Sequence, residues 1–160
     1  MNYTLEQKKK IAQNIWKFAA LSVVDKRVYG AILSVYYLTI ANVEAFHIGW
    51  ILLFGCIASF FFEIPSGYLS DKIGHKKTIV LSRIFFIIST LNYLLANNLI
   101  MLIIGSVFFS LGVACMSGTS TAFIHDTLKA LKREKEYSKV MGKVSAIGYA
   151  VPTIFMISSS

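Results

Sequence analysis

The fold of this chain is decided by residues 48–77, which read IGWILLFGCIASFFFEIPSGYLSDKIGHKK. The first part of the stretch is almost entirely apolar, with Glu63 as its one charged residue, and the last part is polar and basic. An apolar helix of about 20 residues is about 30 Å long, which matches the hydrocarbon core of a bilayer. The stretch therefore predicts a membrane-spanning helix at about Ile48–Tyr68, followed by a polar turn at the membrane surface.

The composition of the whole chain supports a membrane location. The chain has 160 residues, of which 56% are hydrophobic and 15% are charged, whereas soluble domains have about 45–50% and about 25%. A chain this short cannot bury the excess in a core of its own, so lipid must cover it. This composition excludes a disordered chain, a collagen, a disulfide-framed secreted domain and an ordinary cytosolic enzyme.

No cofactor or metal is expected. Cys56 and Cys115 lie far apart in apolar runs and lack the spacing of metal ligands or of a redox pair. The sequence also shows no nucleophile–base pair and no phosphate-binding loop, so we predict that the chain is not an enzyme.

Other apolar stretches of similar length predict further spans, at about residues 16–40, 78–96, 99–124 and 140–160. We therefore predict an all-α fold, a polytopic transmembrane helical bundle over residues 16–160, with residues 1–15 as a cytoplasmic N-terminal segment.

The positive charges predict the orientation of the chain. Fourteen of the 16 Lys and Arg residues would lie on one side of the membrane, and the opposite turns at 41–47 and 97–98 have none. The fourteen are Lys8, Lys9, Lys10, Lys17, Lys72, Lys76, Lys77, Arg83, Lys129, Lys132, Arg133, Lys135, Lys139 and Lys143. Cytoplasmic loops carry such an excess, which places the N-terminus in the cytoplasm and the chain in the cell (inner) membrane. The net charge of +8 is thus a topology signal, with contact to anionic lipid as an addition, and not a nucleic-acid site. Residues 129–143 are predicted to form a solvated helical linker.

Charges inside the first predicted span allow two interpretations. Asp25, Lys26 and Arg27 interrupt it, and a charge in the hydrocarbon costs about 2.5–3.5 kcal/mol or more. They either face a protein or water cavity and form pairs, or Lys26 and Arg27 reach the cytoplasmic interface while residues 11–24 lie on the membrane surface.

Glu63 is a further candidate for the interior of the bundle. Glu63, Gly67 and Asp71 are spaced i, i+4, i+8, so they share one helix face if the helix continues through Pro65. Glu63 would then form a structural ion pair with Lys26 or Arg27, or take up a proton during transport.

The polar turn between the second and third spans has a distinctive pattern. Gly67 and Gly74 permit a close backbone approach and a positive φ, and Asp71 could cap a helix N-terminus or pair with a base. The turn resembles the signature G-x-L-A-D-x-x-G-R-K between helices two and three of the major facilitator superfamily. The matching residues are Gly67, Leu69, Asp71, Gly74 and Lys76, and the sequence departs from the signature at Ser70 and His75.

The resemblance extends along the chain. Residues 62–66 resemble the end of the second helix of bacterial members, and residues 117–119 followed by Asp126 resemble the fourth helix and its cytoplasmic end. Phe108 stands where that helix often carries a membrane-embedded Arg. The signature of the fifth helix is only partly present, in Gly142, Gly148 and Pro152.

The family has twelve spans in two halves and moves small solutes by alternating access, often coupled to protons. The resemblance implies that this chain is the N-terminal portion of such a transporter, about its first five helices, without the last helix of the first half and the second half. It also implies that Asp71 belongs to a gate latch between the halves. The absence of the Arg at Phe108 puts proton coupling in doubt.

We therefore expect a transporter sequence whose 160 residues cannot transport alone, because the substrate pathway runs between the two halves. The alternative is a small integral-membrane scaffold or regulatory protein that associates with partner helices. An antiparallel-dimer drug transporter is disfavoured by the strong charge bias. The expected partners are the lipid bilayer, an unidentified small molecule, and either the remaining helices or another membrane protein.

Overall fold

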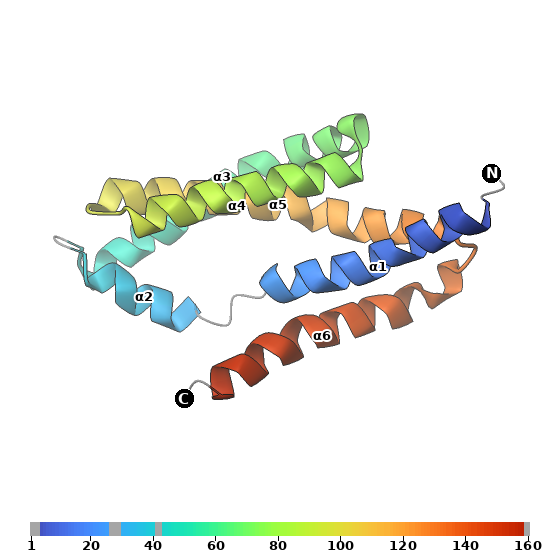
Figure 1. Ribbon diagram of the computed structural model, residues 1–160. Helices are drawn as coiled ribbons and strands as arrows, with labels where there is room; N and C mark the ends of the chain where they lie inside the picture. Colours follow the sequence, from blue (N-terminus) through green and yellow to red (C-terminus); the bar gives the residue numbers. More distant parts are fainter. Residues whose placement is uncertain (1–3, 26–29, 41–42, 159–160) are drawn as a thin grey trace. The chain divides into compact units, whose positions relative to one another are not determined.

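The computed structural model describes residues 4–25, 30–40 and 43–158, and these residues form helices and turns without a strand. The predicted all-α fold is thus confirmed (Figure 1). The elements are α1 (Leu5–Asp25), α2 (Gly30–Leu38), α3 (Ala45–Ile73), α4 (His75–Leu94), α5 (Leu99–Ala130), the short 3₁₀ helix η1 (Glu134–Glu136) and α6 (Tyr137–Ser158). The chain divides into two compact units, residues 31–122 and residues 1–30 together with 123–160, which are described separately.

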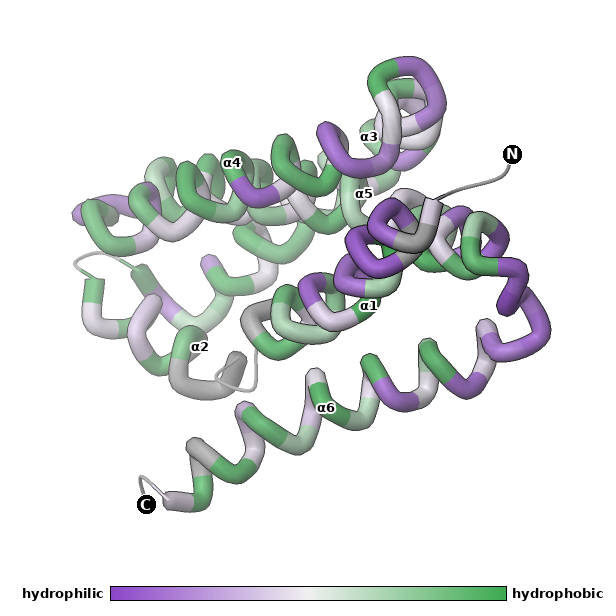
Figure 2. Tube along the Cα trace, turned by 45° about the vertical axis from the view of Figure 1, so that its right-hand side comes forward, coloured by the Kyte–Doolittle hydropathy of each residue, from purple (hydrophilic) through white to green (hydrophobic). Residues whose placement is uncertain are grey.

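Among the described residues, three helices are long and apolar enough to cross a membrane, namely α3, α4 and α5. Figure 2 shows them as predominantly hydrophobic, with hydrophilic residues gathered toward their ends. They overlap the spans predicted at about 48–68, 78–96 and 99–124. At about 1.5 Å per residue, the 29 residues of α3 and the 32 of α5 exceed the thickness of the hydrocarbon core. The polar ends of these helices therefore reach beyond the hydrocarbon.

The region predicted as the first span contains two helices. α1 ends at Asp25 and α2 begins at Gly30, while residues 26–29, with Lys26 and Arg27, lie outside the described residues. α6 occupies the region of the predicted fifth span and begins three residues earlier than expected, at Tyr137.

In the unit of residues 31–122, small and hydroxylated side chains join α3 to α5. Ser106 Oγ donates a hydrogen bond to the carbonyl of Ile51 at 2.8 Å, and Ser66 Oγ donates to the carbonyl of Ala114 at 3.0 Å. Along these contacts the residue numbers increase in the same direction on both helices, from 51 to 66 on α3 and from 106 to 114 on α5. The two helices therefore run parallel. Lipid removes the hydrophobic drive between helices, so such close contacts and hydrogen bonds, each worth about 0.6 kcal/mol, hold them together.

α4 packs antiparallel against α5 in the same unit. Ser89 Oγ donates to the carbonyl of Gly105 at 2.7 Å, and the ring of Phe86 lies directly over Gly112. At the α2 end of the unit, Tyr36 Oη donates to the carbonyl of Tyr93 at 2.8 Å. Around this bond lies the apolar core of the unit, formed by Tyr37, Ile40, Val43, Ile51, Tyr93 and Leu102.

The other unit consists mainly of α1 and α6, which lie side by side and begin at the same end (Figure 1). The two helices come close where Gly148 faces Ser22, because a Cβ on Gly148 would lie only 3.2 Å from the Ser22 carbonyl oxygen. The ring of Phe18 on α1 packs 6.2 Å from that of Phe123 on α5.

The predicted helical linker over residues 129–143 is helical only in part, because it is interrupted at residues 131–133. α5 ends at Ala130, and Lys132 has a φ of 58°, which lets the N–H of Arg133 donate to the Leu128 carbonyl at 2.9 Å and close the helix. Arg133 Nη2 also donates to Glu136 Oε2 at 2.6 Å, and this hydrogen bond lowers the pKa of the Glu136 carboxyl. A turn and η1 thus separate α5 from α6.

Candidate functional site

The turn between α3 and α4 is built on a single residue, Gly74. Its N–H donates to the carbonyl of Ser70 at 3.0 Å and closes α3, while its own carbonyl accepts the N–H of Lys77 at 3.1 Å and of Thr78 at 3.2 Å and opens α4. This double role requires φ +93° and ψ 143°, a region that is accessible essentially to glycine alone. The sequence prediction of a positive φ is confirmed for Gly74 and is wrong for Gly67, which lies inside the helix α3.

Two helices are tied to a third directly beside this turn. Thr119 Oγ1 on α5 donates a hydrogen bond to Ser70 Oγ on α3 at 2.9 Å, and Ser70 Oγ lies 2.8 Å from Nδ1 of His75, the first residue of α4. The side chains of Ser70 and Thr119 are each only 3% exposed. Ser70 and His75, noted in the sequence only as departures from the signature, are therefore in contact. A serine followed five residues later by a histidine across a glycine turn is the signal that could have predicted this contact.

The other signature residues lie on the outside of the turn. Asp71, Gly67 and Lys76 are exposed, and Leu69 is half-buried. The suggested capping role of Asp71 is wrong, because Gly74 is the N-cap of α4 and no side chain caps that helix. The Asp71 carboxylate is instead held on the outer face of the last turn of α3, next to the inward-facing Ser70.

α3 continues without interruption through Pro65, so Glu63, Gly67 and Asp71 share one face. Glu63 is exposed within the described residues and lies about 12 Å along the helix from Asp71. Its predicted pairing with Lys26 or Arg27 concerns residues outside the described part of the chain and stays a prediction. The same holds for the side chain of Asp25, the last residue of α1.

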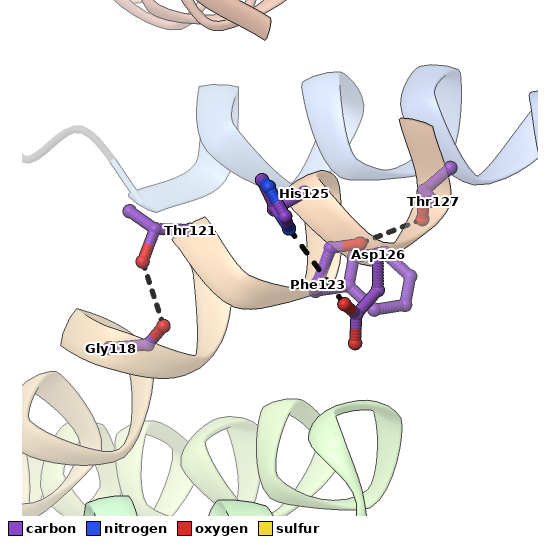
Figure 3. A network of polar contacts seen from close by, with 6 residues as sticks. All are labelled: Gly118, Thr121, Phe123, His125, Asp126 and Thr127. Carbon is purple, nitrogen blue, oxygen red and sulfur yellow. Dashed lines mark hydrogen bonds and ion pairs between the residues drawn. The ribbon is translucent and has the colours of Figure 1, made fainter. Parts of the chain in front are cut away.

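Asp126 lies far along α5, on the part of that helix that belongs to the unit with α1 and α6. It is exposed, and its Oδ1 is 3.9 Å from Nδ1 of His125 (Figure 3). Nearby hydroxyls bond within their own helix, since Thr121 donates to the carbonyl of Gly118 at 2.8 Å and Thr127 to that of Phe123 at 2.7 Å.

Arg83, which was predicted to lie on the basic side of the membrane, has contacts that reach a neighbouring helix, and its position in the membrane stays a prediction. It lies inside α4 and is half-buried, with Nη2 3.8 Å from Met116 Sδ on α5 and its guanidinium 5.6 Å from the centre of the Phe86 ring. Phe108, at the position of the family's Arg on α5, packs 6.2 Å from the ring of Phe85.

In the part of the chain that the structure describes, no group of three or more His, Cys, Asp or Glu side chains could hold a metal ion. The candidate site is the turn between α3 and α4, with the buried contact of Ser70 and Thr119 on its inner side and the exposed carboxylate of Asp71 on its outer side.

Comparison with known proteins gives matches of one kind. A family model described as the Major Facilitator Superfamily matches residues 16–160. Two curated proteins, both named as uncharacterized transporters, come from Buchnera aphidicola subsp. Schizaphis graminum and subsp. Acyrthosiphon pisum. Each is 32% identical to this chain over 127 residues, which are 79% of this chain and 30% of the relative. This chain thus spans about 30% of the length of these relatives. No solved structure gives a significant match.

Proposed function

Since the chain belongs to the Major Facilitator Superfamily, we propose that it forms part of a transporter that moves a small solute across the membrane by alternating access. Membership makes it a multi-pass membrane protein and supports a role in transport and not in catalysis. Because the chain spans only 30% of its curated relatives, the substrate pathway would need helices beyond these 160 residues, and the chain alone would not transport.

The observation that carries the proposal is the turn between α3 and α4. Gly74 alone separates α3 from α4, and the last turn of α3 presents Asp71 outward. A rigid, exposed carboxylate at a helix end suits a contact that forms in one state of a transporter and breaks in another, because an exposed ion pair is worth about 1 kcal/mol or less and opens easily.

The orientation follows from the charges around the same turn. Lys72, Lys76 and Lys77 are all exposed, and by the positive-inside rule they lie in the cytoplasm. We place the N-terminus and the turn on the cytoplasmic side of the inner membrane, with the turn at residues 97–98 on the outer side.

Phe108 on α5 stands where the family often has a membrane-embedded Arg. Coupling of transport to an ion would therefore depend on other residues. Glu63 lies in the apolar part of α3. Its negative charge would be compensated either by a pair with Lys26 or Arg27 or by a transported proton. Lipid and the remaining helices of the transporter are the proposed partners.

Flux measurements test this function. The chain is reconstituted in proteoliposomes, alone and as a chimaera in which it replaces the matching 127 residues of a Buchnera aphidicola relative. A panel of radiolabelled sugars, amino acids and organic cations serves as probe. We expect uptake by the chimaera and none by the chain alone. Uptake by the chain alone, or a correctly inserted chimaera that carries no solute at all, would contradict the proposal.

A further inference from the structure

We propose that Thr119, Ser70 and His75 are positioning residues for the turn between α3 and α4. Their contacts fix the direction in which that turn presents Asp71. This inference rests on the proposed function, because it assigns a task to side chains beside Asp71. Each of the three comes from a different helix, α5, α3 and α4 respectively. The chain of contacts thus ties both sides of the turn to α5.

Two polar contacts meet at Ser70. Thr119 Oγ1 donates a hydrogen bond to Ser70 Oγ at 2.9 Å. Ser70 Oγ also lies 2.8 Å from Nδ1 of His75, and the imidazole tautomer decides which of the two atoms donates. Ser70 takes part in both contacts, so it is the central residue of the three.

Because Ser70 and Thr119 are buried, their hydrogen bond favours one arrangement of α3 against α5. Ser70 and Thr119 are each 3% exposed, so water cannot readily replace the partner that either hydroxyl would lose if α3 turned or slid against α5. An alanine at position 70, as in the signature that the turn resembles, would leave Thr119 and Nδ1 of His75 without the Ser70 hydroxyl as their hydrogen-bond partner. The two departures from the signature, at Ser70 and His75, therefore form one local contact.

The consequence for Asp71 follows from helix geometry. Successive side chains on an α-helix point about 100° apart, so an inward anchor at Ser70 turns Asp71 to the outside, where it is exposed. Gly74 alone would let α4 swing, because a glycine has wide conformational freedom. The contact from Ser70 to His75 spans that glycine and restrains the swing.

The other hydroxyls of α5 provide matched controls. Thr127 is buried like Thr119, at 5% exposed, but its hydroxyl bonds to the carbonyl of Phe123 in its own helix (Figure 3). A threonine-to-valine change keeps the shape of the side chain and removes the hydroxyl. Thr119→Val thus removes a contact between helices, and Thr127→Val removes a contact within one helix.

The experiment measures the mobility of a spin label at the turn in the full chain in lipid vesicles. The label is attached at Lys72→Cys, next to Asp71, in a chain whose exposed Cys56 is replaced by serine, since Cys115 is buried. A second label at Phe46→Cys, near the start of α3, reports on the helix as a whole. Thermal unfolding is recorded in parallel.

Thr119→Val is expected to raise the mobile fraction at position 72 about threefold, in keeping with the loss of one hydrogen bond between membrane helices. Ser70→Ala removes two contacts and should raise it further. Position 46 should not change. Thr119→Ser, which keeps the hydroxyl, should restore the original spectrum. The double variant of Thr119→Val and Ser70→Ala should add little to Ser70→Ala alone, because that change already removes the partner of Thr119.

A merely structural role would loosen positions 72 and 46 together and lower the unfolding temperature in proportion. That outcome overturns the inference, as does an equal effect of Thr127→Val at position 72 or a failure of Thr119→Ser to restore order. If Thr119→Val does not insert, His75→Phe is used instead, since it breaks only the contact across the turn. Label mobility does not depend on transport, so a chimaera without flux refutes the proposed function and leaves this test intact.

Discussion

Gly55 on α3 lies directly against Ser106 on α5, so closely that a Cβ added to Gly55 would come within 2.5 Å of Ser106 Oγ. The same hydroxyl donates to the carbonyl of Ile51, one turn away on α3. The absence of a side chain at Gly55 therefore permits the hydrogen bond that joins the two helices at this level.

We predict that Gly55→Ala destabilises the fold by about 1–3 kcal/mol, the usual cost of overpacking a close interface. Unfolding in detergent, followed by intrinsic fluorescence, measures this. Gly67→Ala on the same helix is the control, because nothing lies within 4 Å of its added Cβ; it should be neutral or slightly stabilising. Ser106→Ala in the Gly55→Ala background should recover part of the loss, and equal effects at positions 55 and 67 would refute the packing explanation.

Gly74→Ala is predicted to cost about 1–3 kcal/mol, because its backbone conformation is strained for any residue with a Cβ. The added Cβ meets no atom within 4 Å, so the penalty is conformational and not steric. Gly74→Asn should not rescue it, since asparagine tolerates the left-handed helical region but ψ is 143° here. Circular dichroism during thermal unfolding provides the measurement. A tolerated alanine at position 74 would show that the turn does not depend on this geometry.

The sequence predicted the helical class and the three apolar helices α3, α4 and α5, because apolar length and turn residues are local properties. It could not predict which side chains meet across helices. The contact from Thr119 to Ser70 joins residues 49 positions apart, and no local pattern encodes it. The contact of Arg83 with Met116, 33 positions away, could not be predicted for the same reason.

Opposite accessibility is predicted for the two turns that flank α4. In a chain with Cys56→Ser, a cysteine at Lys76 should react with a membrane-impermeant maleimide only in inside-out vesicles. A cysteine at Asn97, which is exposed in the turn before α5, should react only in intact spheroplasts. The reason is the concentration of lysines around residues 72–77 and their absence at 97–98. Labelling of position 76 from outside intact cells would overturn the proposed orientation.

Glu63→Gln is predicted to lower the amount of chain that inserts stably, if the carboxylate is paired with Lys26 or Arg27. Removing one member of an ion pair inside the hydrocarbon leaves the other charge without compensation, which costs about 2.5–3.5 kcal/mol or more. Insertion is measured as the membrane-bound, protease-resistant fraction. Glu134→Gln is the control, since Glu134 is exposed in η1 and its carboxylate is in reach of water.

The partner of Glu63 can be identified by a second change. If Arg27 is the partner, Glu63→Gln with Arg27→Gln should insert better than Glu63→Gln alone, because no uncompensated charge is left. If Lys26 is the partner, only the double variant at position 26 should recover. Normal insertion of Glu63→Gln itself would show that the carboxyl is unpaired. Its task would then be uptake of a proton, and flux through the chimaera should respond to an imposed pH gradient when Glu63 is present and lose that response in the Glu63→Gln variant.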